Sequence, residues 1–138
     1  MLNQQDAQQR ILVLISKGKE IHQRAMNGYI WDDSTFEGGI FNECVFENNQ
    51  FRNCVVNDCV FSNVVFYNCH WLESSFSRVN FNRCIFINCT FESSNFIETT
   101  LVSSHVEKVT LREITGDAIN FFNNNKLNLI IFDSIIEK

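Results

Sequence analysis

The sequence between Phe36 and Leu111 repeats every five residues, and from Phe76 to Phe96 it reads FSRVNFNRCIFINCTFESSNF. A large apolar residue occupies every fifth position of this stretch, and we call these positions the centres. The centres are Phe36, Phe41, Phe46, Phe51, Val56, Phe61, Phe66, Trp71, Phe76, Phe81, Phe86, Phe91, Phe96, Leu101, Val106 and Leu111. A helix repeats at about 3.6 residues and a strand at about 2, so neither places these side chains on one face. A fixed internal period instead predicts a solenoid, whose units bury their apolar sides by stacking on one another.

A second set of mostly small residues stands two positions before each centre. These residues are Ser34, Gly39, Cys44, Asn49, Cys54, Cys59, Val64, Cys69, Ser74, Val79, Cys84, Cys89, Ser94, Thr99, Ser104 and Val109. In an extended backbone, residues two apart point to the same side. We therefore expect each unit to send one small and one large side chain inward, while its other residues face outward or turn a corner.

This pattern resembles the pentapeptide-repeat family, whose motif is a small residue, a polar residue, Leu or Phe, and two variable positions. The segments 94–98 (SNFIE) and 89–93 (CTFES) fit that motif, although Cys stands where the family more often has Ala and Phe where it more often has Leu. The resemblance implies an all-β solenoid, a right-handed quadrilateral β-helix in which four units make one square coil. Residues 34–115 would then form about four coils.

The chain is expected to divide into an N-terminal helix and cap (1–31), the pentapeptide-repeat β-helix (32–121) and an apolar C-terminal segment (122–138). Residues 2–26 read as an amphipathic α-helix, and Gly28 is a suitable C-terminal stop. A cap is needed because the open end of a solenoid leaves unpaired strand edges. The alternative is a helix that binds a partner or a membrane surface.

The five-residue register fails at Gly116, which occupies the next expected centre. Phe121 resumes it once, and the Asn123–Asn125 run then indicates a turn. The tail from Leu127 to Ile136 is strongly apolar, and its pattern does not distinguish a strand from a short helix. It is either a C-terminal cap or a dimerisation surface, and the resemblance implies dimerisation for some family members.

The six cysteines of the 138-residue chain all fall on the small inward positions. Cys is small and readily buried, so this placement indicates packing rather than a disulfide framework. We therefore expect reduced thiols and a cytoplasmic location, in a bacterium if the resemblance holds. Secretion as a bacterial effector is also compatible with the family.

Nothing in the sequence indicates catalysis. The histidines are His22, His70 and His105, and His70 follows Cys69 directly, so in extended backbone the thiol and the imidazole point to opposite sides of the wall. The cysteines lack zinc-finger spacing, and no glycine-rich phosphate loop is present. We predict a protein that is not an enzyme, with no catalytic residues, no metal site and no cofactor.

Residues twenty positions apart should stack on the same face of a square coil. One face then collects apolar residues at outward positions, which are Val45, Val65 and Ile85 in one column and Tyr67 and Ile87 in the next. Asn48, Asn68 and Asn88 edge this face, and the neighbouring face adds Ile40 and Val60. A contiguous outward apolar patch predicts an interaction with a protein partner of unidentified nature or with a second copy. The alternatives are that the C-terminal tail covers the patch, or that strand propensity alone favours Val and Ile there.

An acidic cluster suggests a different function. The acids are Asp32, Asp33, Glu37, Glu43, Glu47 and Asp58, against a single base, Arg52, in the same stretch. The resemblance brings in family members that mimic DNA and bind a topoisomerase, DNA gyrase. Basic residues at Arg78, Arg83, Lys108 and Arg112 interrupt the acidic surface further along. The net charge of −5 argues against direct nucleic-acid binding, and no apolar run is long enough to span a membrane.

Overall fold

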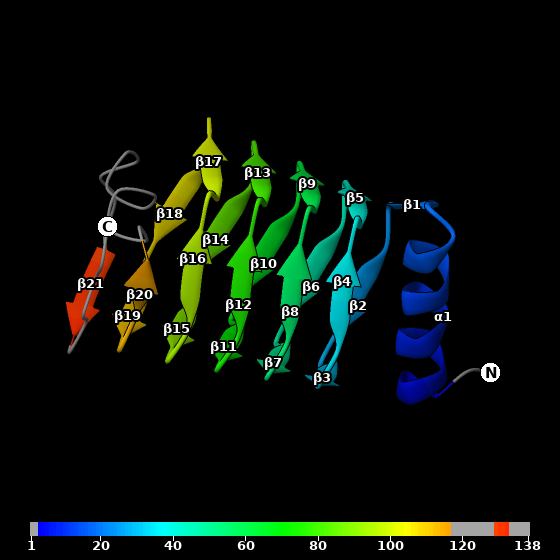
Figure 1. Cartoon of the computed structure of the whole chain (residues 1–138), viewed down its shortest axis with the longest axis horizontal. Helices are drawn as coiled ribbons and strands as arrows, with labels where there is room; N and C mark the ends of the chain where they lie inside the picture. The colour runs from blue at the N-terminus through cyan, green and yellow to red at the C-terminus, as the bar shows by residue number, and fades with distance from the viewer. Residues whose placement is uncertain (1–2, 117–128, 133–138) are drawn as a thin grey trace.

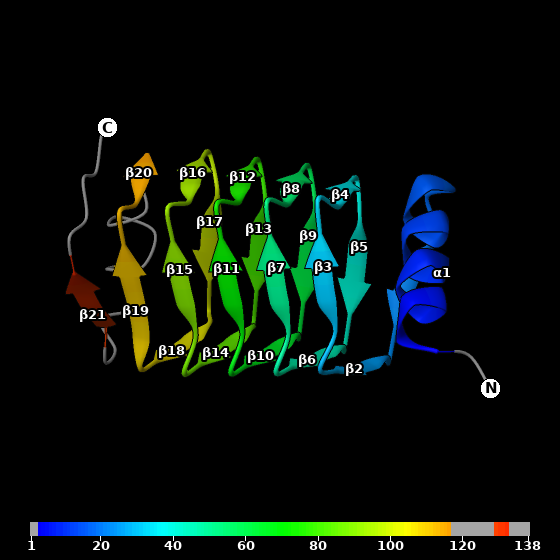
Figure 2. The same cartoon turned by 90° about the horizontal axis from the view of Figure 1, so that it is seen from below.

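The computed structural model describes residues 3–116 and 129–132. Its one helix in these residues, α1 (Gln4–Ser16), stands across one end of a rod of short strands (Figure 1, Figure 2). The strands form four parallel sheets, which we call walls A to D. The predicted β-solenoid is therefore confirmed.

Each wall stacks one strand from every coil. Wall A contains β1 (Glu20–His22), β5 (Ile40–Asn42), β9 (Val60–Ser62), β13 (Asn80–Asn82) and β17 (Thr100–Val102). Wall B contains β2 (Ala25–Asn27), β6 (Val45–Glu47), β10 (Val65–Tyr67), β14 (Ile85–Ile87) and β18 (His105–Glu107). Wall C contains β3 (Ile30–Asp32), β7 (Gln50–Arg52), β11 (His70–Leu72), β15 (Thr90–Glu92), β19 (Val109–Arg112) and β21 (Leu129–Phe132). Wall D contains β4 (Thr35–Glu37), β8 (Val55–Asn57), β12 (Ser75–Ser77), β16 (Asn95–Ile97) and β20 (Thr115–Gly116).

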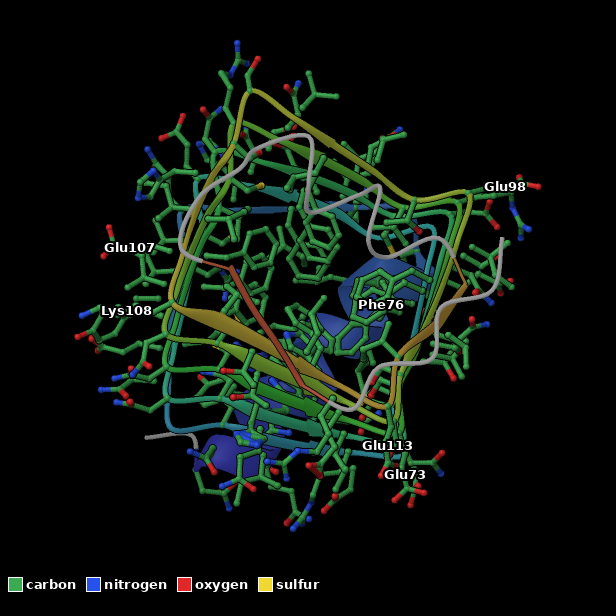
Figure 3. All side chains as sticks on the ribbon, turned by 90° about the vertical axis from the view of Figure 1, so that its left-hand side faces the viewer. Glu73, Phe76, Glu98, Glu107, Lys108 and Glu113 are labelled. Carbon is green, nitrogen blue, oxygen red and sulfur yellow. The ribbon has the colours of Figure 1, made fainter. Side chains whose placement is uncertain are left out.

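Consecutive strands lie on consecutive walls, so four strands close one coil. Seen along the rod, the chain traces a quadrilateral, with Phe76 inside it and Glu98 and Glu107 outside (Figure 3). The solenoid has about 5 coils rather than the predicted four. The extra coil is the first one, because the strands begin at Glu20 instead of residue 32.

The prediction of a helix over residues 2–26 is wrong in its C-terminal half. The helix ends at Ser16, and Gly18 follows it with φ +68°, while Gly28 lies at a corner of the first coil. Ile21, Met26 and Trp31 continue the five-residue register as buried centres. The sequence pattern did not predict the first coil, because Lys19, Arg24 and Tyr29 stand where later coils carry small residues. Here at the end of the rod, Lys19 and Arg24 are exposed and Tyr29 is half-buried.

The interior follows the predicted register. All sixteen predicted centres are buried, and so are the small positions apart from Ser34 and Ser104, which are half-buried. Rings of successive coils stack on one another, as Phe66 does on Phe86 with centroids 4.8 Å apart. Each fully buried aromatic ring contributes roughly 1.5–3 kcal/mol, so the centres supply most of the stabilisation.

Every corner of the described coils contains a residue with positive φ. Seventeen of these residues are not glycine, and their φ values lie between 47° and 56°. The left-handed region costs a side chain free energy, least for Asn and Asp, and several corners carry Asn. This residue lets an extended chain turn a right-angled corner within five residues.

The C-terminal strand β21 pairs in parallel with β19 and lengthens wall C. Of the tail from Leu127 to Ile136, residues 129–132 are therefore a strand. Phe121, Asn123–Asn125 and the rest of segment 122–138 lie outside the described residues. The register breaks at Gly116 because only glycine fits there: a Cβ at this position would lie 2.1 Å from the Phe96 carbonyl oxygen.

Candidate functional site

Wall B brings the predicted apolar residues together. Val45, Val65 and Ile85 pair in register along β6, β10 and β14, and Tyr67 pairs with Ile87 one column away. Their side chains point away from the core, because the centres Phe46, Phe66 and Phe86 lie between the two columns and are buried. We call these five outward residues the wall B strip.

The wall B strip is a close-packed surface rather than a set of separate side chains. Val45 is 38% exposed and Tyr67 is 40% exposed, whereas Val65, Ile85 and Ile87 are half-buried. Stacked side chains on neighbouring strands lie about 5 Å apart, so residues in the middle of the strip shield one another. The strip is therefore continuous and flat.

Asparagines form a hydrogen-bonded ladder along one edge of the strip. The Asn88 side-chain amide donates to Asn68 Oδ1 at 2.5 Å, Asn68 donates to Asn48 Oδ1 at 3.2 Å, and Asn48 donates to Asn27 Oδ1 at 3.3 Å. The sequence predicted the position of these residues but not their bonds. The ladder gives the apolar strip a polar border with fixed amide orientations.

The tail residues that the structure describes do not cover the strip. β21 lies in wall C, beyond β19, and not over wall B. The neighbouring wall A exposes Ile40 (43%) and Val60 (36%) beyond an intervening corner. The prediction that wall A adds apolar surface is therefore correct, and Val102 (52% exposed) adds a further apolar residue in the other column of that wall.

The acidic residues do not gather on one face. Asp32 lies on wall C, Glu37 on wall D and Glu47 on wall B, while Asp33, Glu43 and Asp58 lie at three different corners. Two of them are paired with arginine: Arg52 Nε lies 2.6 Å from Asp32, and Arg78 Nε lies 2.7 Å from Asp58. The hydrogen bonds from these guanidinium groups lower the pKa of each carboxyl group.

The six thiols are free and buried in the core. Each donates to the carbonyl oxygen of the centre 23 residues earlier, as Cys84 Sγ does to Phe61 O at 3.2 Å. Burial raises the pKa of Cys54, Cys59 and Cys84 to about 11. For Cys69, a hydrogen bond with Cys89 and burial together raise the pKa. Buried thiols that stay protonated are poor nucleophiles, because the thiolate is the reactive form.

The described coils do not bring the candidate pair Cys69 and His70 together. Cys69 is buried while His70 is exposed, so the two side chains lie on opposite sides of wall C, as predicted. Within residues 3–116 and 129–132, no three His, Cys, Asp or Glu residues converge as metal ligands. No helix among these residues is long and apolar enough to cross a membrane.

One buried polar cluster was missed at the sequence level. The Trp31 indole donates to Asn49 Oδ1 at 2.9 Å, and the Asn49 amide donates to the carbonyl oxygens of Met26 and Glu47. Asn49 is fully buried at a position where the next two coils carry Cys69 and Cys89. The exceptional residue type at a small position could have indicated this cluster.

Comparison with known proteins identifies the repeat. Residues 74–112 match the model of the pentapeptide repeats in 8 copies. This segment of the chain therefore consists of pentapeptide repeats. No curated protein matches its sequence significantly.

Solved structures, among them the pentapeptide repeat proteins Rfr23 and HetL, are similar to the chain at low sequence identity. Rfr23 from the cyanobacterium Cyanothece 51142 is 10% identical, with a TM-score of 0.45, over 95% of this chain and 96% of that one. HetL from Nostoc sp. strain PCC 7120, involved in heterocyst differentiation regulation, is 10% identical with a TM-score of 0.36, over 99% and 81%. QnrB1, a plasmid-mediated fluoroquinolone resistance protein, is 14% identical with a TM-score of 0.28, over 83% and 68%.

Proposed function

We propose that this protein is a non-enzymatic interaction module that presents wall B to a protein partner. The observation that carries the proposal is the alignment of an apolar column across β6, β10 and β14 beside a shorter one across β10 and β14. Outward positions that face only solvent are usually polar, as Gln50 and His70 are on wall C. A contiguous exposed apolar patch is typical of a binding face, whereas single exposed apolar residues are common on any surface.

The rigidity of wall B favours binding. Each strand of the strip is paired on both sides, and the asparagine ladder fixes the border. A surface that is already ordered loses little conformational entropy on association. The partner is then expected to offer a flat apolar face, and a second copy of the chain, through wall B or the segment 122–138, is the homodimer alternative.

The buried free thiols suit a reducing compartment, so we propose that the module works in the cytoplasm. Mimicry of DNA toward a topoisomerase has less support. A DNA mimic needs a dense run of negative charge, about one charge per ~1.7 Å of duplex. Here the acids are spread over several walls and corners, and two of them pair with Arg52 and Arg78.

Site-specific photo-crosslinking tests the proposal directly. A benzophenone amino acid in place of Tyr67 puts the reactive group on wall B, and the same group in place of His70 puts it on wall C. Both positions are exposed outward positions of neighbouring strands, β10 and β11. In cells of the source organism, we expect a discrete protein adduct from position 67 but not from position 70. Excess wild-type chain should compete for the partner and reduce the yield of this adduct. Adducts from position 70 only, or identical adducts from both, would refute wall B as the binding face.

A further inference from the structure

Of the six cysteines, Cys69 and Cys89 are the pair that the solenoid stacks directly on each other. They lie twenty residues apart, immediately before β11 and β15, and Thr90 N donates to the Cys69 carbonyl oxygen at 3.0 Å. Each of the other four cysteines has a different residue type at the positions twenty residues before and after it. The pair therefore lies across the boundary between the third coil and the fourth.

The spacing of the two residues suits a disulfide bond. Neighbouring strands lie about 4.8 Å apart, and disulfides join Cα atoms that are roughly 4.4–6.8 Å apart. Both side chains point into the core, where Cys69 Sγ donates to Phe46 O at 3.2 Å and Cys89 Sγ donates to Phe66 O at 3.3 Å. The two thiols also share a hydrogen bond, which is the largest cause of the raised pKa of Cys69. The two sulfur atoms are therefore neighbours in the reduced protein.

A buried indole N–H is directed at the same pair. Trp71 Nε1 has no hydrogen-bond partner within the described part of the chain. Trp31 and Trp71 hold their rings alike, since each stacks on the phenylalanine one coil later, with centroids 6.2 and 6.0 Å apart. The Trp31 N–H reaches Asn49, so the Trp71 N–H is directed at the equivalent residue, Cys89. A buried donor without an acceptor is costly, and an oxygen atom on the Cys89 sulfur would supply that acceptor.

We propose that Cys69 and Cys89 form a peroxide-sensitive pair, which hydrogen peroxide converts into a disulfide bond between the third and fourth coils. In the first step the Cys89 sulfur attacks one peroxide oxygen, the O–O bond breaks, and Cys89 becomes a sulfenic acid as one water leaves. In the second step the Cys69 sulfur attacks the Cys89 sulfur, the S–O bond breaks, and a second water leaves. The two thiols lose two electrons and their two protons, and the peroxide takes up both.

Burial makes this reaction slow and its product durable. Each thiol is 1% exposed, so peroxide reaches the pair only when wall C opens locally between β11 and β15. Once the disulfide forms, the two coils cannot separate at this point, and reductants meet the same barrier. Cys69 and Cys89 directly follow Asn68 and Asn88, which border the wall B strip. The pair is therefore a clamp beside that strip, and sustained oxidation closes it.

Peptide mapping of the full wild-type chain tests the proposal. The folded protein is treated with excess hydrogen peroxide, and the remaining thiols are then alkylated in denaturant. Chymotrypsin cleaves after aromatic residues and releases 68–71 and 87–91, each with a single cysteine. We expect these two peptides to become linked about tenfold or more faster than any other pair of cysteine peptides. In the oxidised protein, amide exchange at residues 68–70 and 88–90 should slow about tenfold or more.

Serine variants assign the order of the two steps and supply a matched control. Serine suits these positions, because Ser74 and Ser94 occupy small positions of the same solenoid and donate to main-chain carbonyl oxygens. In Cys69→Ser, a probe specific for sulfenic acid should label Cys89 about fivefold or more above its labelling of Cys69 in Cys89→Ser. The control Cys54→Ser keeps the pair and should form the disulfide as the wild type does.

Three results from the wild-type chain would overturn the proposal. They are no linked peptides from the folded protein, linked peptides that form only in denaturant, and linkage no faster than that of other cysteine pairs. Equal sulfenic acid labelling of the two single variants would overturn the assignment of Cys89 as the first site of oxidation. If a serine variant fails to fold, the corresponding alanine variant replaces it, and the wild-type mapping still decides the proposal.

Discussion

At the scale of single residues, two tryptophans occupy equivalent places on wall C but have different surroundings. Trp31 donates to Asn49, whereas Trp71 Nε1 is buried with no hydrogen-bond partner within the described part of the chain. Cys89 holds the position for Trp71 that Asn49 holds for Trp31, and its thiol donates to the carbonyl oxygens of Phe66 and Ile87. Asn49 therefore makes the two carbonyl bonds of a core cysteine and adds an acceptor for an indole.

This comparison predicts the effect of Asn49→Cys. The Trp31 indole would lose its acceptor in the buried core, so the free energy of unfolding should fall by about 1–3 kcal/mol. Adding Trp31→Phe removes the indole N–H that is left without an acceptor. The double variant should therefore lose less free energy of unfolding than the sum of the losses of the two single variants. Urea denaturation of the four proteins measures this coupling. Strictly additive losses would show that the indole bond contributes nothing.

The buried thiols predict an alkaline loss of stability. Burial raises the pKa of Cys54, Cys59 and Cys84 to about 11 in the fold, against about 8.5 for a free cysteine. Between these values the unfolded chain releases protons that the folded chain keeps. The stabilisation is therefore full below about pH 8.5 and is lost as the pH rises toward 11. Urea midpoints at about pH 8 and about pH 10.5 should differ less when all three cysteines are alanine, and an unchanged difference would contradict this origin.

At the scale of elements, corners and strands place different demands on a side chain. Arg83 turns a corner with φ 53°, while its neighbour Asn82 ends strand β13. Arg83→Val puts a β-branched residue into the left-handed region and should cost about 1–2 kcal/mol, whereas Asn82→Val should stay within about 0.5 kcal/mol. Chemical denaturation compares the two. Equal costs would mean that the corners tolerate any residue.

Some elements could be predicted from the sequence and others could not. The centres were predicted because a large apolar residue every five positions fits neither a helix nor a simple strand. The first coil was missed because Ile11, Leu14, Ile15 and Ile21 also fit a helical period, and the large side chains of Arg24 and Tyr29 broke the pattern of small residues. Asn48, Asn68 and Asn88 recur along one edge of wall B, and their positive φ could not be predicted without knowing that a corner lies there.

At the scale of the whole molecule, the parallel register puts the residues that stabilise the fold at inward positions and the residues that we propose for binding at outward positions. Every coil buries its own ring of centres against its neighbours, so the outward positions are free to serve binding. The two columns of wall B were predictable because four units of five residues return the chain to the same wall. Their exposure was not predictable, since it depends on the packing of neighbours such as Tyr67 and on what covers the wall. The side chains of Gln4 and Gln8 in α1 donate to the carbonyl oxygens of Gly28 and Ile30. These hydrogen bonds could not be predicted from the sequence either, because they depend on how α1 lies over the rod.

The most direct test of wall B compares two pairs of conservative substitutions. Val65→Thr/Ile85→Thr alters wall B, and the control Val60→Thr/Ile40→Thr makes the same chemical change on wall A. Thr keeps the β-branched shape and the strand preference, so both variants should fold with similar free energies of unfolding. The measurement is affinity for the protein captured from position 67, or for a second copy if that is what is captured. We predict about tenfold or greater weakening for the wall B pair only, since truncating contacts at an interface centre commonly costs over ~1.4 kcal/mol. Unchanged binding by the wall B pair, or equal loss in the wall A pair, would contradict the account.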